Sequence, residues 1–323
     1  MPGVTYREAT LDDAALASDL MTAAYPPMPQ DPVTTEFRWR NLRKGFVAGR
    51  FIAERDGVPA AFLGWLHGPW HELPDRHCEV EVWLSRDQLD VDLLAAMWTF
   101  VEDRAAVEEP HLLLAYAGED ESEMLESLAR CGFQRERLEK VWELDLRANG
   151  ARLMAEAAEA LQEMSNAGIA LTTLAGWADP DKLRKLHQLD RRTRHDIPTS
   201  VAIVSESYED FERRTNGPDR RADRYWVAIA GDQPVAMSYL RFPPVRGPIW
   251  TGYTCSDPAH RGRGIARAIK LQSLAQAVEL GVPYVLTDND SQNAPMLHIN
   301  ERLGYVRRPG FVEHHKRVDK DSA

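Results

Sequence analysis

The stretch WTGYTCSDPAHRGRGIARAIK occupies residues 250–270 and decides the fold. Its first part, residues 249–255, is rich in β-branched and aromatic residues, which predicts a strand. Ser256-Asp257-Pro258 then forms a turn that cannot continue a sheet. Good helix formers follow from residue 265 to 280, and Gly281 with Pro283 ends that run. The stretch therefore predicts a strand, a tight turn and a helix in direct succession.

The turn between the strand and the helix has the composition of an anion site. Gly262 and Gly264 allow several backbone N–H groups to converge on one point. The helix that begins here presents the positive end of its dipole, and Arg261, Arg263 and Arg267 add positive charge. We expect a phosphate or pyrophosphate group to bind there. A solvated loop with basic residues is the alternative that a Gly-x-Gly pattern alone leaves open.

Two common phosphate-binding classes do not fit this turn. A Walker-type loop requires a Gly-Lys-Ser/Thr ending, which is missing. A dinucleotide-binding turn requires a third glycine and an acidic residue about twenty residues further on, and residues 262–267 lack both.

A second motif follows at the spacing of a known family. Residues 284–287 predict a strand that leads into Asn289, and residues 293–305 read NAPMLHINERLGY. The segment from Arg261 to Ala266 fits the pattern Gln/Arg-x-x-Gly-x-Gly/Ala, and the Leu-Gly-Tyr ending closes the second block. Together these motifs resemble the acyl-coenzyme-A core of the GNAT acyltransferase superfamily.

The resemblance implies a protein that contains both helices and strands, in the α/β class in its broad sense and α+β in the narrower one. Each domain would hold a mixed, mainly antiparallel sheet flanked by helices, with two strands splayed around the acyl-CoA. It implies acetyl-CoA as co-substrate and no metal. Backbone N–H groups of the strand before the turn would meet the thioester carbonyl. The residues that it assigns to cofactor binding are Thr254, Cys255, Ser256, Arg261, Gly262, Arg263, Gly264, Ile265, Ala266, Asn289, Asn293 and Asn300.

The order of predicted elements occurs twice along the chain. Ala53 and Pro59 recur 175 positions later as Ala228 and Pro234. A repeat of this length indicates duplicated domains. We expect a degenerate N-terminal GNAT-like domain over 1–147, a linker helix over 148–168 and a functional C-terminal domain over 169–323. This arrangement is similar to tandem GNAT proteins of the mycothiol synthase type.

The first copy has lost the anion-binding turn. Its counterpart, residues 85–92, reads SRDQLDVD, with no glycine and three aspartates that repel phosphate. The distribution of charge also distinguishes the two copies, because the excess of acidic residues lies in the first. Residues 1–168 hold 16 Lys and Arg against 31 Asp and Glu, whereas the remainder holds 23 against 19. We therefore expect one active site, in the second copy.

Composition excludes several classes of protein. A net charge of −11 argues against a nucleic-acid surface and favours a cationic substrate. No apolar run approaches the length of a membrane span, and the first residues lack a signal peptide. The three cysteines are sparse and unpatterned, so we expect no disulfide and no zinc site. We expect a soluble, cytoplasmic protein that acts as a monomer or homodimer, without nucleic-acid or membrane partners.

Catalytic residues are harder to assign than the cofactor turn. Many GNAT members place a tyrosine seven residues after the asparagine of the closing helix, to protonate the leaving thiolate. Here that position is Asn300, and an amide is no acid. Tyr253 is the candidate acid. Cys255 admits a covalent role, although a small buried thiol explains it more simply.

The acceptor side is expected in the loop after the first helix of the second domain. There Asp196 would bind an ammonium group and His195 would relay its proton, unless both are merely polar residues of an exposed loop.

The hypothesis from sequence is an N-acetyltransferase. It would move an acyl group from CoA to a primary amine of a small, cationic molecule by direct attack. The alternatives are a non-catalytic acyl-CoA sensor or interaction protein, and an acyltransferase that takes its acyl group from an acyl-carrier protein.

Overall fold

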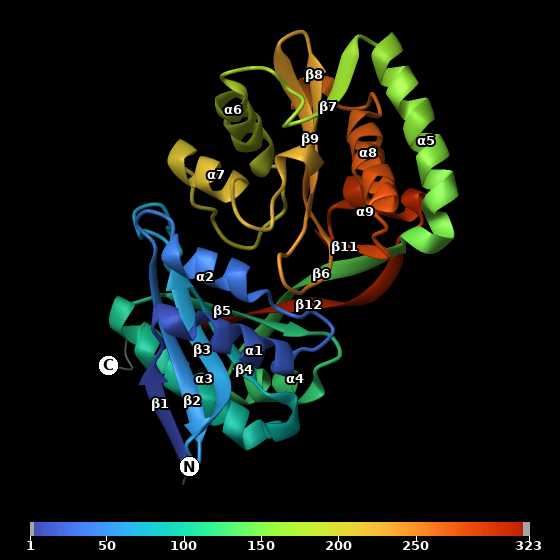
Figure 1. The fold of residues 1–323 in the computed structure, drawn as a ribbon. Helices are drawn as coiled ribbons and strands as arrows, with labels where there is room; N and C mark the ends of the chain where they lie inside the picture. Colours follow the sequence, from blue (N-terminus) through green and yellow to red (C-terminus); the bar gives the residue numbers. More distant parts are fainter. Residues whose placement is uncertain (1–2, 319–323) are drawn as a thin grey trace.

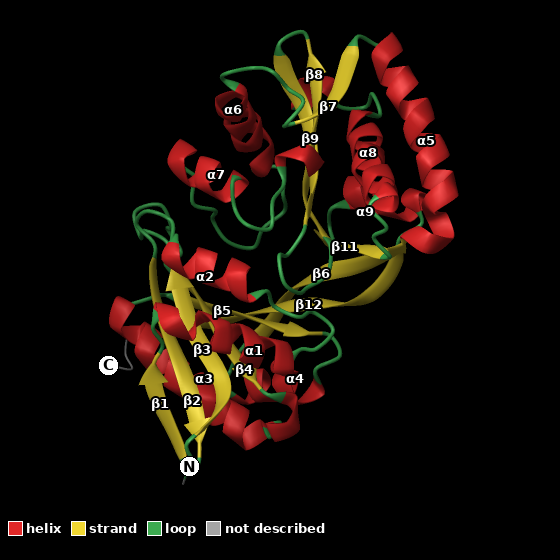
Figure 2. Cartoon of the chain, in the orientation of Figure 1, coloured by secondary structure: helices red, strands yellow, loops and turns green. Residues whose placement is uncertain are grey.

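The computed structural model describes residues 3–318, and their strands form one twelve-stranded sheet (Figures 1 and 2). The order across it is β1-β2-β3-β4-β5-β12-β6-β11-β10-β9-β8-β7. The first half of the chain contains β1 (Val4–Glu8), α1 (Ala14–Ala24), α2 (Pro32–Arg40), β2 (Val47–Arg55), β3 (Val58–His67), β4 (His77–Leu84), α3 (Val91–Ala105), β5 (Leu112–Gly118), α4 (Ser122–Arg130) and β6 (Gln134–Asp145).

The second half repeats this order after a long helix. It contains α5 (Leu146–Asn166), β7 (Ile169–Thr173), α6 (Lys182–Arg194), α7 (Tyr208–Thr215), β8 (Tyr225–Ala230), β9 (Gln233–Arg241), β10 (Trp250–Ser256), α8 (Ile265–Glu279), β11 (Tyr284–Asp290), α9 (Ala294–Leu303) and β12 (Val306–Arg317). The α+β class and the tandem arrangement predicted from sequence are confirmed.

The duplication is visible in the details of strand pairing. In the first half, Ala53 pairs with Ala61, and the next pair is shifted by a bulge that places Pro59 opposite Glu54. In the second half, Ala228 pairs with Ala236, and the same kind of bulge places Pro234 opposite Ile229. Proline has no backbone N–H to donate to a neighbouring strand. A bulge next to it shifts the pairing, so that the ladder of hydrogen bonds does not require a donor at that position. The repeated residues thus specify the same irregularity twice.

The two halves exchange their sixth strands. β6, from the first half, lies between β11 and β12 of the second half, and β12 pairs with β5 of the first half (Figure 1). Residues 134–145 thus form one long strand whose partners lie far away in sequence, and not a local hairpin. Neither half has a complete sheet without the other.

Helices cover both faces of the sheet in each half. In the second half, α5 and α8 bury one face and α6 and α7 the other, each over its own apolar cluster. Leu153, Ala157 and Ala160 of α5 are buried against this core, so the helix expected as a linker is part of the second unit. In the described part of the chain, no helix is both long and apolar enough to cross a membrane.

Candidate functional site

Two neighbouring strands of the second half separate at the point where the sequence predicts a ligand. β10 and β11 run parallel, but only Trp250 and Leu286 are paired between them. Beyond this pair β10 stays paired with β9 as far as Ser256. The outer edge of β10 from Thr251 onward therefore faces open space instead of a neighbouring strand.

A β-bulge at Gly252 shapes this edge. The register of β10 against β9 shifts between Thr251 and Tyr253. A Cβ on Gly252 would lie 2.1 Å from the ring of Tyr239, so only glycine fits. The N–H of Asp257 donates to β9, and strand residues alternate in the direction of their N–H groups. Thr254 and Ser256 thus direct their N–H groups into the gap between β10 and β11.

The turn after β10 and the start of α8 close one end of the gap. Gly264 is the residue before α8, with φ +76°, and Gly262 has φ +72°. A Cβ at either would meet no atom within 4 Å, so the space above the turn is free. Among residues 3–318, no side chain caps the first N–H groups of α8. These free donors and the positive end of the helix dipole favour an anion.

A cavity of about 1170 Å³ follows the gap from this turn into the protein. Ten of the twelve residues predicted to bind a cofactor line it: Thr254, Cys255, Ser256, Arg261, Gly262, Gly264, Ile265, Ala266, Asn289 and Asn293. Arg263 is exposed and lies outside the lining. The strand edge, the turn and the start of α9, predicted from separate motifs, therefore share one cavity.

Asn300 does not reach this cavity. Its side chain is fully buried, and its Nδ2 donates to Oδ1 of Asn289 at 2.6 Å while its Oδ1 accepts from Lys270. The direct contact with a cofactor expected from sequence does not fit this placement. Asn300 instead holds Asn289, which lines the cavity.

Lys270 is a polar residue of the cavity that sequence reasoning missed. It lies on α8 between core residues, none of its surface is exposed, and its Nζ lies 4.8 Å from the centre of the Tyr305 ring. Burial lowers the pKa of Lys270 to about 7, partly offset by the charge of Asp288. A lysine at a position where the helix otherwise buries apolar residues was the signal in the sequence.

Cys255 and Tyr253 project from β10 into the core beneath α6. Burial raises the pKa of Cys255 to about 12, which leaves almost no thiolate at neutral pH. The hydroxyl of Tyr253 lies 3.2 Å from Oγ1 of Thr193, and burial also raises the Tyr253 pKa above its ordinary value. Both line the cavity, but neither is poised as an ionised nucleophile.

Asp196 and His195 take different places. The carboxylate of Asp196 lines the cavity and forms an ion pair with Arg261 of the anion turn. His195 is exposed, and its side chain is absent from the residues that line the cavity. The proton relay expected between them therefore has no support in the geometry.

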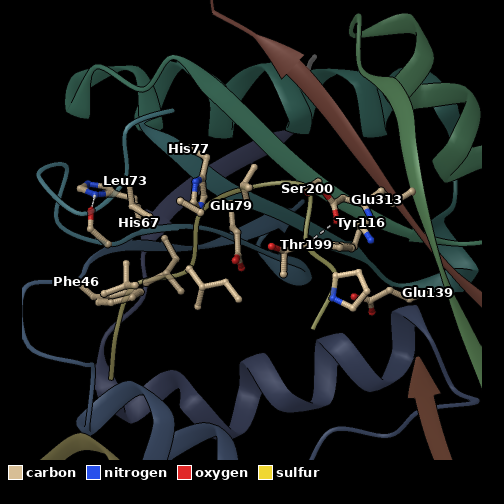
Figure 3. A pocket seen from close by; sticks show the side chains of 18 of the residues that line it. Phe46, His67, Leu73, His77, Glu79, Tyr116, Glu139, Thr199, Ser200 and Glu313 are labelled. Carbon is tan, nitrogen blue, oxygen red and sulfur yellow. Dashed lines mark hydrogen bonds between the residues drawn. The ribbon is translucent and has the colours of Figure 1, made fainter. Parts of the chain in front are cut away.

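A smaller hollow of about 260 Å³ adjoins this cavity at the junction of the two halves (Figure 3). Glu79 of β4, Glu139 of β6 and Glu313 of β12 line it, with Tyr116 on β5. The segment 198–204 of the second half lies across it. Glu139, Asp290 and Arg43 line both spaces, so the hollow and the cavity share a wall. Nothing in the sequence motifs pointed to Glu79, Glu139 or Glu313 as residues of a site.

Within the described residues, no group of three or more His, Cys, Asp or Glu side chains is placed to hold a metal ion.

Comparison with known proteins identifies the second half. Residues 181–305 match the model of the "Acetyltransferase (GNAT) family". No curated protein matches the chain. A solved "Tandem GNAT protein from the clavulanic acid biosynthesis pathway" has the same fold, with a TM-score of 0.75, 16% identity and coverage of 98% of this chain and 100% of the other.

Further solved structures agree on the fold. A GCN5-related N-acetyltransferase from Sphaerobacter thermophilus has a TM-score of 0.66 at 17% identity, over 97% of this chain and 95% of that one. An acetyltransferase from the GNAT family of Colwellia psychrerythraea has a TM-score of 0.60 at 12% identity, over 97% and 99%.

Proposed function

We propose that this protein transfers the acetyl group of acetyl-CoA to a primary amine of a small cationic molecule, because residues 181–305 match the GNAT acetyltransferase family and the whole chain has the tandem GNAT fold. One observation carries this proposal: the gap between β10 and β11 joins the free N-terminus of α8 to an acidic hollow. A pyrophosphate fits one end and an ammonium group the other.

The anion turn would hold the phosphates. Free N–H groups of Gly264 and the first turn of α8 supply donors, and the helix dipole adds a favourable field. Arg261 would exchange its partner Asp196 for a phosphate oxygen. This residue already lies at the turn, so binding requires only a change of partner.

The edge of β10 would position the thioester. Thr254 and Ser256 direct N–H groups into the gap, where a pantetheine chain can take the place of a paired strand. A backbone donor fixed in this way stabilises the negative charge that forms on the carbonyl oxygen during attack. The amine attacks the carbonyl carbon, the C–N bond forms, and the C–S bond breaks.

The acidic hollow would select the acceptor. Glu79 and Glu139 both have pKa values raised to about 7, first by burial and then by neighbouring carboxylates. A bound cation relieves this repulsion between carboxylates, which favours a positively charged acceptor over a neutral one.

A thiol-release assay tests the proposal. The protein is incubated with acetyl-CoA and, in turn, methylamine, 1,4-diaminobutane, lysine and spermidine, with glycerol as a hydroxyl control. We expect free CoA thiol with at least one amine and none with glycerol. Tight acetyl-CoA binding without thiol release would favour a non-catalytic sensor. Absence of CoA binding would favour an acyl-carrier-protein donor.

A further inference from the structure

The exchanged strand β6 brings a carboxylate of the first half to the cavity of the second. Glu139 pairs through its backbone with Asp290 on β11 and with Phe311 on β12. β11 is also the strand whose separation from β10 opens the gap. Glu139 therefore lies beside the proposed acyl-transfer site, although the sequence assigns it to the other domain.

Glu139 lies at the boundary between the two spaces. It lines both the larger cavity and the acidic hollow, and Figure 3 shows its side chain at the edge of that hollow. Within the described residues, no hydrogen bond or ion pair engages its carboxylate. The neighbouring acidic side chains, in contrast, have hydrogen-bond or ion-pair partners. Asp290 holds Arg137 at 2.6 Å, and Glu313 accepts from Ser200 and Tyr116. Glu139 is thus free to accept a hydrogen bond from a ligand.

The charges around Glu139 adjust its protonation. Burial and the carboxylates of Asp288, Glu313 and Asp290 raise its pKa to about 7, and Arg137 opposes them. Arg43 also faces both spaces. A base with a pKa near the working pH is ionised often enough to accept a proton and basic enough to take one from an ammonium group.

We propose that Glu139 is the catalytic base of this protein, and that it receives a proton from the acceptor as the acceptor passes from the acidic hollow into the cavity. This inference rests on the proposed function. The ammonium group gives one proton to the Glu139 carboxylate and becomes the amine that attacks. When the C–N bond has formed and the C–S bond breaks, the second proton of the nitrogen goes to the thiolate. Glu139 then releases its proton to water.

The test compares Glu139→Gln with the wild-type protein, using the amine from the panel above that gives the highest wild-type rate. Glu143→Gln is the matched control, because Glu143 lies on the same strand and lines neither space. We expect Glu139→Gln to lower kcat by roughly 100-fold or more, with a small change in KM and unchanged acetyl-CoA affinity. Glu139→Asp, which keeps the charge, should retain part of the rate.

The pH profile separates catalysis from structure. In the wild-type protein kcat/KM should rise with pH and level off above about pH 7, and Glu139→Gln should lack this limb. An unchanged rate or the same limb in Glu139→Gln would overturn the assignment of Glu139 alone. A wild-type protein that releases no thiol with any amine would overturn the proposed function and this inference together.

Discussion

The Nζ atom of Lys270 lies 2.6 Å from Oδ1 of Asn300, and neither side chain is exposed. Asn300 in turn donates a hydrogen bond from its Nδ2 to Asn289, which lines the cavity. Three side chains from α8, α9 and β11 are thereby fixed to one another. The network places a titratable group next to the proposed thioester site without exposing it to water.

Lys270 should make the stability of the protein depend on pH. Its pKa in the folded state is about 7, against 10.5 for an ordinary lysine. Between these values the unfolded chain binds one more proton, so stability rises with pH by up to about 1.4 kcal/mol per unit from this residue. Below pH 7 both states are charged and the cost of burial is fully present.

Lys270→Met removes this charge while keeping most of the volume. Relative to wild type, we expect the variant to be favoured most at pH 6, and its advantage to shrink by about 1–3 kcal/mol at pH 9. Urea unfolding at both pH values measures the difference. Lys44→Met, at an exposed lysine, is the control and should leave the pH dependence unchanged. An equal effect of Lys270→Met at the two pH values would contradict the lowered pKa.

Asp196 should compete with the cofactor for Arg261. Asp196→Asn breaks their ion pair and leaves Arg261 available to a phosphate. Since the pair is half-exposed, we expect a modest gain, a Kd for acetyl-CoA lower by about two- to fivefold in calorimetry. His195→Ala should have no effect, because His195 lies outside the cavity. A raised KM for the amine with unchanged acetyl-CoA affinity would instead support Asp196 as an ammonium site.

Cys255 should be dispensable for turnover. Its pKa of about 12 and its burial predict slow alkylation by iodoacetamide at pH 8. Cys255→Ala should keep kcat within about twofold, with a loss of stability of about 1 kcal/mol from the small void. Cys131, which is less buried, is the internal comparison and should be alkylated faster than Cys255. A covalent mechanism would require the variant to lose nearly all activity.

The strand exchange should make the two halves interdependent. Residues 1–145 and 146–323, produced separately, each lack a strand that the other supplies. We expect neither fragment to show a cooperative thermal transition alone, and a mixture to regain one transition close to that of the whole chain. Circular dichroism during heating measures this. Two fragments that each melt cooperatively would show that the exchanged strands are not required.

The sequence predicts those features of the structure that depend on residues close to one another along the chain. Gly264, with its positive φ, and the helix after it follow from neighbouring residues, and so does the strand from Trp250 to Ser256. The family resemblance added the tandem fold, and the comparisons support it through the family match over residues 181–305 and the shared fold of the whole chain. The paired bulges at Ala53 and Ala228 show that the repeat visible in the sequence is also structural.

The remaining features depend on contacts between distant segments. The residues of β6 indicate a strand, but they do not indicate that its partners are β11 and β12. The sequence alone therefore does not indicate that Glu139 lies at the site. Lys270 lies within an apolar helix pattern, where only the packing around it makes its charge significant. Asn300 was assigned to the cofactor by analogy, whereas its two short hydrogen bonds direct it to Lys270 and Asn289.

The most direct test of the central claim is calorimetric titration of acetyl-CoA into wild-type protein, Gly264→Glu and Gly281→Glu. Gly264 and Gly281 have similar positive φ values, +76° and +72°, and free space beyond Cα, but they lie at opposite ends of α8. Backbone strain is therefore matched, and only Gly264→Glu places a negative charge at the anion turn. We predict that Gly264→Glu weakens binding by about 100-fold or more, while Gly281→Glu binds like wild type. Equal affinity in Gly264→Glu and wild type would contradict the assignment of this turn as the cofactor site.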